Sequence, residues 1–104
     1  MKLIYHPAAE AEVVAAARFY ELRVKGLGTQ FLDEFDRCIA RIVESPVRWR
    51  IVLHEKRRYL MPRFPYGIYY RVTGDEIRIL VVKHHSQHPD YGLGRRYGCS
   101  AAPI

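Results

Sequence analysis

Two runs of β-branched and aromatic residues, 66–72 and Glu76–His84, constrain the fold of this chain more than any other feature. The dipeptide Gly74-Asp75 separates them, and a leading glycine suits a tight hairpin turn because it takes a positive φ without strain. Val81 and Val82 continue the second run without alternation, which indicates a strand buried on both faces. The sequence therefore predicts a central β-hairpin whose last strand runs into a polar segment, 83–88.

Length and composition are those of a small globular domain. The chain has 104 residues, 49% of them hydrophobic, which is enough for one core. We expect a single domain over residues 1–96 and a flexible tail over residues 97–104. No apolar run approaches the roughly 20 residues of a membrane span, and Pro7 interrupts the first apolar run before it resembles a signal peptide. Cys38 and Cys99 indicate two free thiols, so we expect a cytoplasmic protein.

The charge is distributed unevenly along the chain. The net charge is +6, yet residues 1–45 carry six basic and seven acidic side chains. Residues 46–104 carry eleven basic and four acidic side chains. This asymmetry favours an acidic or polyanionic partner for the C-terminal half, the alternative being that excess arginine serves solubility alone.

Two helices are predicted before residue 45. The first covers residues 8–24, after Pro7, which is tolerated in a first helical turn, with Gly26 as its C-cap. A stripe of small and aromatic residues marks its buried face: Ala9, Val13, Ala16 or Ala17, and Tyr20. The second helix begins at 27–29 and runs to Glu44, because Ser45-Pro46 ends it. Its apolar face contains Phe31, Leu32, Phe35, Ile39 and Ile42, and its polar face contains Asp33, Glu34, Asp36, Arg37 and Arg41.

The remaining strands complete an α+β fold. Residues 2–5 and 56–61 are predicted as strands, whereas 46–55 gives no regular pattern beyond Trp49, a core anchor or, less favoured, a stacking surface. The order is β-α-α-β-β-β, an antiparallel sheet with an N-terminal helical hairpin packed on one face. Side-chain alternation places Tyr66, Ile68, Tyr70 and Val72 on one side of the sheet. The other face is expected to stay partly open and basic through Arg58, Arg71, Arg78 and Lys83, and Arg95-Arg96 to form a mobile basic arm.

The motifs RFPYGIYYRV, GDEIRILVV and HHSQHPDY, placed after a strand and a helical hairpin, resemble the RelE/ParE superfamily of small bacterial toxins. The resemblance is to its ParE-like branch, often called plasmid stabilisation proteins, and covers about residues 2–96. It implies the toxin of a type II toxin–antitoxin module, bound by a cognate antitoxin in a hetero-oligomer. It also implies one of two activities, since RelE-like members cut mRNA in the ribosome and ParE-like members poison DNA gyrase without being nucleases.

Three positions bear on that choice. Cleavage of RNA needs groups that accept a proton, stabilise the phosphorane and protonate the leaving oxygen. Gly67 and Gln87 stand where RelE-like toxins carry basic residues, and an amide does not offset phosphorane charge as a guanidinium does. We therefore expect a gyrase-binding toxin rather than an enzyme. Gln87 and Gly92 also depart from the ParE-like pattern of Arg and Trp, so two alternatives stay open: a ribosome-dependent mRNA endonuclease, and a non-toxic antitoxin-binding module.

Candidate site residues follow from the same resemblance and from the charge. If the protein is a nuclease, His84, His85 and Tyr91 are the candidates for acid–base catalysis; the structural alternative is that His84 stabilises the turn into Pro89. No metal or other cofactor is predicted, because no Cys or carboxylate cluster accompanies the histidines. The residues expected to bind the target or the antitoxin are Lys56, Arg57, Arg58, Arg71, Arg78, Lys83, His88, Arg95 and Arg96.

Overall fold

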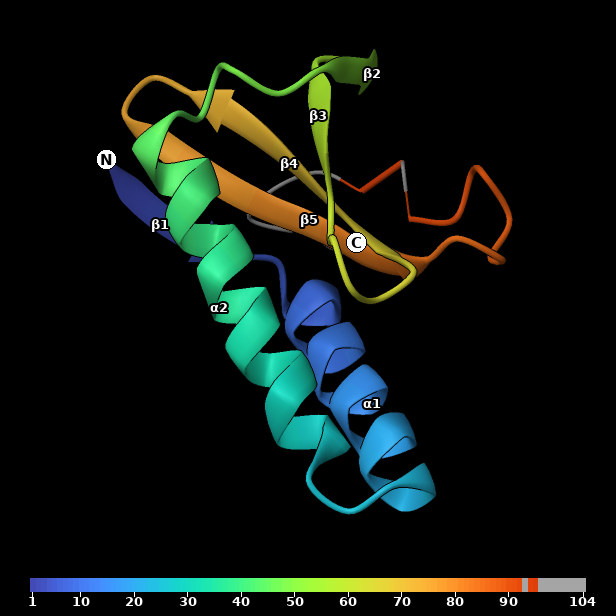
Figure 1. Cartoon of the computed structure of the whole chain (residues 1–104). Helices are drawn as coiled ribbons and strands as arrows, with labels where there is room; N and C mark the ends of the chain where they lie inside the picture. The colour runs from blue at the N-terminus through green and yellow to red at the C-terminus, as the bar shows by residue number, and fades with distance from the viewer. Residues whose placement is uncertain (93, 96–104) are drawn as a thin grey trace.

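The structure, a computed structural model, describes residues 1–92, 94 and 95, which form two helices and a five-stranded sheet (Figure 1). The elements in chain order are β1 (Lys2–Tyr5), α1 (Pro7–Arg23), α2 (Leu27–Glu44), β2 (Ile51–Leu53), β3 (Lys56–Leu60), β4 (Tyr66–Thr73) and β5 (Glu76–His84). The α+β class, the helical hairpin and the central β4–β5 hairpin are therefore confirmed. No helix within the described residues is long and apolar enough to cross a membrane.

The sheet is mixed, which corrects the expectation of an entirely antiparallel one. Its strand order is β1-β5-β4-β3-β2. β1 pairs with β5 in parallel, Lys2 lying beside Glu76 and Tyr5 beside Ile79, while the other pairings are antiparallel. Parallel neighbours require a long crossover connection, and the helical hairpin together with three strands supplies it. The first strand therefore pairs with a strand far along the chain.

A second correction concerns residues 46–55, which contain the short edge strand β2. Ile51 lies opposite Arg57 in β3. The turn between these strands is made by His54 and Glu55, both with positive φ, at 47° and 64°. Turns of this kind usually signal themselves through glycine or asparagine, and neither is present. The residue types in this turn therefore gave no sign of the hairpin in the sequence.

The helices form close to the predicted bounds, but their caps differ. His6 precedes α1, and its Nδ1 accepts a hydrogen bond from the Ala8 N–H at 3.0 Å. Gly26, with φ of 88°, is the residue before α2 rather than the C-cap of α1. The Glu21 carboxylate accepts hydrogen bonds from the N–H groups of Gly26 and Gly28, both at 2.9 Å. A carboxylate from α1 therefore caps the N-terminus of α2, where unpaired N–H groups favour negative charge.

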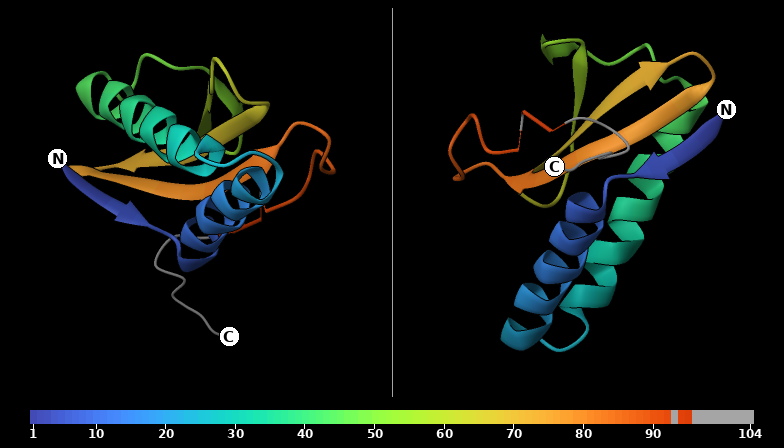
Figure 2. Two further views of the ribbon diagram at one scale, coloured as in Figure 1. Left: turned by 60° about the horizontal axis from the view of Figure 1, so that its bottom comes forward. Right: turned by 180° about the vertical axis from the view of Figure 1, so that it is seen from behind.

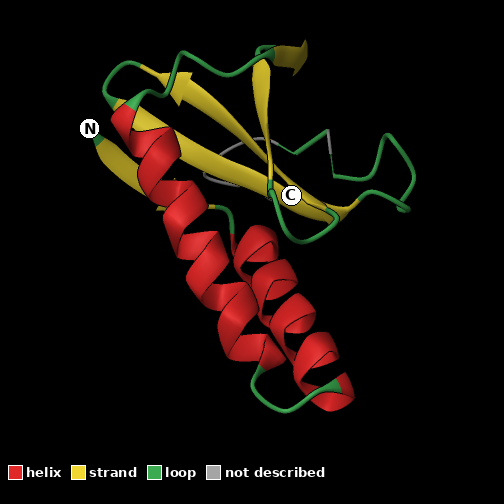
Figure 3. Ribbon diagram, viewed as in Figure 1, coloured by secondary structure: helices red, strands yellow, loops and turns green. Residues whose placement is uncertain are grey.

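The helical hairpin packs one end against the sheet and projects its loop beyond it (Figures 1 and 3). The helices approach each other closely at Gly28, because a Cβ there would lie 2.5 Å from the Ala17 carbonyl oxygen. The core joins both helices to one face of the sheet. Its members include Ala9, Val13, Ala16, Phe31, Phe35, Ile39, Ile42, Ile68, Tyr70, Ile77, Ile79 and Val82. Tyr66 and Val72 pack against the same cluster, which confirms the side predicted for these β4 residues.

The opposite face carries a second, smaller cluster formed by Tyr69, Leu80 and Val81, with Val52 packed against it. Val81 and Val82 belong to different clusters, which confirms that β5 is buried on both faces. The chain after β5 returns along this side of the sheet (Figure 2). Gly92, with φ of 72°, packs so closely that a Cβ would lie 2.9 Å from a Val81 methyl group.

The pairing of β1 with β5 ends at Ile79. Beyond that position, side chains from other segments complete the hydrogen bonding of the β5 edge. The Glu12 carboxylate accepts from the Val82 N–H at 2.9 Å and from the Tyr91 hydroxyl at 2.6 Å. Arg95 donates to the Leu80 carbonyl at 2.9 Å and forms an ion pair with Glu12 at 2.7 Å. We call Glu12, Tyr91 and Arg95 the β5 clamp. Arg95 is therefore held in place rather than part of a mobile arm; Arg96 and residues 97–104 lie outside the described part of the chain.

Candidate interaction site

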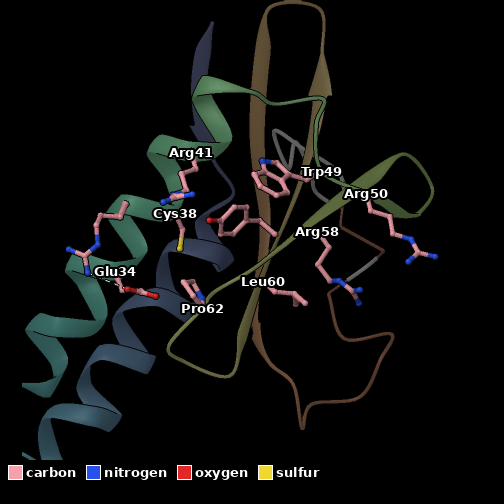
Figure 4. A pocket seen from close by; sticks show the side chains of 10 residues that line it. Glu34, Cys38, Arg41, Trp49, Arg50, Arg58, Leu60 and Pro62 are labelled. Atoms are coloured by element: carbon pink, nitrogen blue, oxygen red, sulfur yellow. Dashed lines mark hydrogen bonds and ion pairs between the residues drawn. The ribbon is translucent and has the colours of Figure 1, made fainter.

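A pocket of about 530 Å³ lies between α2 and β3 (Figure 4). Its walls come from α2, from the segment before β2, from β3 and from the loop that follows β3. The lining residues are Glu34, Arg37, Cys38, Arg41, Trp49, Arg50, Arg58, Tyr59, Leu60 and Pro62. The volume is in the range of ligand pockets, about 300–1,000 Å³.

The lining is strongly basic, with four arginines and one glutamate. Glu34 is 3% exposed and already neutralised: it accepts hydrogen bonds from Arg37 at 3.2 Å and from the Arg63 N–H at 3.1 Å. Within the described residues, the side chains of Arg41, Arg50 and Arg58 form no hydrogen bond or ion pair. Arg41 extends from α2 on the side of Cys38, and Arg58 extends from β3 (Figure 4). The pocket therefore carries uncompensated positive charge on two of its walls.

Aromatic side chains form the apolar part of the pocket. The rings of Trp49 and Tyr59 meet edge to face with their centroids 4.7 Å apart, and Arg48 lies over the indole at 4.9 Å. Trp49 packs against the main core, so its predicted role as an anchor is confirmed. Its indole N–H is buried without a hydrogen-bond partner in the described structure.

The thiol of Cys38 sits beside this aromatic pair and is 2% exposed. Burial, and secondarily the charge of Glu34, raises the pKa of Cys38 from 9.0 to about 11, although a hydrogen bond with Tyr59 offsets part of the shift. A thiol with a raised pKa is protonated at neutral pH and is a poor nucleophile. Cys38 therefore contributes packing to the pocket rather than reactivity.

This pKa leads to a prediction for alkaline stability. The unfolded chain loses the Cys38 proton near pH 9 and the folded chain keeps it to about pH 11, so the free energy of unfolding should fall between these values. The loss attributable to Cys38 is about 2–3 kcal/mol. Urea unfolding of wild type and Cys38→Ala, at pH 8 and near pH 11, measures it. Equal alkaline losses in the two proteins would contradict the assignment.

The predicted binding residues on β3 have different surroundings. Arg57 faces the helical side and donates to the carbonyls of Val47 and Trp49, at 3.0 and 2.7 Å. Arg58 faces the other side and lines the pocket. Lys56 is 4% exposed, and burial, followed by the charge of Arg71, lowers its pKa. Of these three residues, Arg58 is the one whose charge is open to a partner.

The basic residues of β4 and β5 are engaged within the chain. Arg71 forms an ion pair with Glu55 at 3.2 Å, and Arg78 forms one with Glu76 at 2.6 Å. Lys83 is 5% exposed, and its ammonium donates to the carbonyls of His88 and Pro89, at 3.2 and 2.6 Å. Arg71 and Arg78 lie opposite each other in the register of β4 and β5, on the face of the sheet away from the helices, as predicted, but each is paired within the chain.

His84, the last residue of β5, and His88, in the segment that follows, accept hydrogen bonds from the local backbone. His84 accepts a hydrogen bond from the Ser86 N–H at 2.9 Å through Nδ1, and its ring meets Tyr66 edge to face at 5.2 Å. The Gln87 side chain in turn accepts from the His84 N–H at 2.9 Å. His88 is exposed and accepts from the Asp90 N–H at 3.0 Å through Nδ1. These bonds give His84 the turn-stabilising role that the sequence allowed as its structural alternative.

The other catalytic candidates, His85 and Tyr91, have different surroundings. The His85 ring is exposed, with its centroid 6.4 Å from that of His84. The Tyr91 hydroxyl donates to Glu12 in the β5 clamp. In residues 1–92, 94 and 95, no group of three or more His, Cys, Asp or Glu side chains is placed to hold a metal ion.

Sequence reasoning missed three residues, two that line the pocket and one in the β5 clamp. Glu34 was assigned to the polar face of α2, but it follows Phe31 by one helical turn and precedes Cys38 by another, which puts it on the buried stripe. Arg41 was placed on that polar face without a role. Glu12 carried no local signal, because its partners lie about 70 and 80 positions later.

Comparison with known proteins gives the family. Residues 3–89 match the model of the ParE toxin of type II toxin–antitoxin systems, parDE. The fold is similar to that of a solved structure described as the chromosomal ParDE TA system from P. aeruginosa, with a TM-score of 0.63 at 22% identity, covering 81% of this chain and 95% of that one. No curated protein sequence matches the chain. Since the family model covers most of its length, the chain belongs to the ParE toxin family of type II toxin–antitoxin systems.

Proposed function

We propose that this toxin acts in the cytoplasm by binding DNA gyrase, and that a cognate antitoxin neutralises it. Membership of the family implies the antitoxin partner. The observation that carries the choice of a binding toxin over a nuclease is the use of the polar residues at the end of β5 and in the turn that follows. Lys83, His84 and Gln87 all bond to the backbone of the turn.

A ribosome-dependent nuclease would need those groups free. Its site must accept a proton from a ribose hydroxyl and hold the negative charge of a phosphorane. Here the Lys83 ammonium is buried against two carbonyl oxygens, and positions 67 and 87 supply no cation. Gly92 is required by its contact with Val81, so the absence of a tryptophan there has a packing reason and is consistent with retained toxicity.

Expression of the toxin without its antitoxin is the direct test. Growth should stop, cells should filament and mount a DNA-damage response, and bulk translation should continue at first. Supercoiling by purified gyrase should be inhibited by the purified toxin. Rapid loss of translation with mRNA cut at the ribosomal A site would favour the endonuclease, and undisturbed growth at confirmed soluble expression would favour the non-toxic module.

Substitutions of the histidines separate scaffold from catalyst. His84→Ala should lower the free energy of unfolding by about 1 kcal/mol, because the Ser86 N–H loses its partner, and toxicity should fall only with the amount of folded protein. His85→Ala should change neither stability nor toxicity. Ribosomes programmed with mRNA should show no cleavage with any of these proteins. Cleavage by wild type that a stably folded His84 or His85 variant abolishes, typically by 10²–10⁴-fold for a catalytic group, would overturn the gyrase proposal.

A further inference from the structure

The outer side of α1 is apolar although it is exposed. Val14 is 50% exposed and Leu22 is 87% exposed. Seen from behind, α1 lies in front of α2, and no other described segment crosses its outer side (Figure 2). Exposed apolar side chains recur there at helical spacing: Ala11, Val14, Ala15, Phe19 and Leu22. A surface helix normally presents a polar face to water, so this side of α1, which we call the outer α1 face, has the character of an interaction surface.

Two charges of opposite sign flank the middle of the outer α1 face. Glu10 lies one helical turn before Val14 and Arg18 lies one turn after it, and both are exposed. Within the described residues, neither side chain forms a hydrogen bond or an ion pair. Eight residues, about 12 Å along the helix axis, separate them, which is too far for them to pair with each other. The face therefore carries a charge pattern that is complementary to itself when it is reversed.

We propose that two copies of this toxin associate through the outer α1 face, with the two helices antiparallel and a two-fold axis at Val14. In such an interface the same patch of both copies takes part, and every contact occurs twice. A residue that lies four positions before Val14 meets the residue four positions after it in the other copy. Glu10 of each copy therefore faces Arg18 of the other. Parallel helices would bring like charges together, so the signs select the antiparallel arrangement.

The shape of the molecule suits this arrangement. The side chains of Ala11 and Ala15 are small, and the distance between packed helices depends on the side chains at the contact, so the helices can approach closely. The loop end of the helical hairpin projects beyond the sheet (Figure 1), so antiparallel pairing places the two sheets at opposite ends of the helix pair. The lining of the pocket between α2 and β3 includes no α1 residue. The outer α1 face is therefore separate from the candidate site described above.

Analytical ultracentrifugation of the purified toxin, free of antitoxin, measures the association. One helix from each copy makes a contact smaller than the roughly 1,200 Å² of a stable interface, so we expect a Kd between about 1 μM and 1 mM. Wild type should shift from monomer to dimer as its concentration is raised through this range. Val14→Asp should stay monomeric, because it places two carboxylates at the two-fold axis. A monomeric wild type, or a Val14→Asp variant that dimerises as wild type does, would overturn the proposal.

Charge reversal tests the orientation of the helices. Glu10→Arg and Arg18→Glu each bring like charges together at both contacts of the dimer, so each variant alone should associate about tenfold more weakly than wild type. An equimolar mixture of the two variants restores opposite charges at both contacts and should associate as strongly as wild type. The net charge is +6 in wild type and becomes +8 and +4 in the variants, a change of two units each. Both variants are thus net positive, and unspecific attraction between them does not explain recovery.

The matched controls are Asp33→Arg and Arg50→Glu, which reverse exposed charges outside the outer α1 face and should leave the association unchanged. Circular dichroism and thermal melting establish that each variant is folded. Failure of the mixed variants to recover would show that the copies meet in another register or through another surface, and would overturn the proposal. So would a monomeric wild type whose antitoxin binding is lost in Val14→Asp, because the antitoxin would then be the occupant of this face. Growth arrest and gyrase inhibition test the proposed function separately.

Discussion

Replacing Glu12 by alanine should destabilise the folded toxin by about 3 kcal/mol. Removal leaves Arg95, with a side chain 17% exposed, without its ion-pair partner, and leaves the Val82 N–H and the Tyr91 hydroxyl without acceptors. Breaking a buried pair by removing one member costs about 3–5 kcal/mol, and the partial exposure here places the expectation at the lower end. The melting temperature should fall by roughly 12–24 °C.

Glu10→Ala is the matched control, because Glu10 is exposed on the same helix, and it should shift the melting temperature little. Hydrogen exchange adds a local readout. In Glu12→Ala the Val82 amide should lose protection before the amides of β4 do. A variant as stable as wild type would show that the β5 clamp contributes no net stability.

Replacing Gly28 by alanine should cost about 3 kcal/mol, although alanine is the better helix former. The added Cβ would lie 2.5 Å from the Ala17 carbonyl oxygen and 2.9 Å from the Glu21 Cβ. Both obstacles belong to the facing helix, so relief requires the helices to separate, and overpacking of this kind typically costs 1–3 kcal/mol or more. Separation also strains the Glu21 cap of α2.

Gly94→Ala serves as the control, since nothing lies within 4 Å of its Cβ position. Chemical denaturation of the two variants beside wild type gives the comparison. A Gly28→Ala protein that unfolds at the wild-type midpoint would mean that the helices tolerate a wider spacing than the structure indicates.

Sequence periodicity predicted those features of the fold that depend on residues close together in the sequence. Phe31, Phe35, Ile39 and Ile42 share a helical face whatever they pack against, and the Gly74 turn fixes the β4–β5 hairpin locally. Glu34 was missed because a charged residue on a buried stripe is interpretable only when its partner is known. Besides Arg37, one turn away, its partner is the Arg63 N–H, 29 positions along the chain.

The site was predicted less well than the fold, for the same reason. Charge counts identified the C-terminal half as basic, but they do not separate a cation with an internal partner from one without. Arg58 and Arg71 look alike in the sequence, yet Arg71 is paired with Glu55 and Arg58 lines the pocket. The pocket also depends on Arg41 and Cys38, which come from a helix that the charge asymmetry had assigned to the other half.

The parallel pairing of β1 with β5 also sets a late step in the folding of a newly made chain. Lys2 pairs with Glu76, which is made 74 positions later. Non-local contacts of this kind slow folding because the loop between the partners must close first. The helical hairpin needs only local contacts and is expected to form early. The surfaces of the sheet exist only after the last strand has joined its centre. We therefore expect chains interrupted before β5 to be non-toxic. The antitoxin is then needed only once synthesis and folding of the toxin are complete.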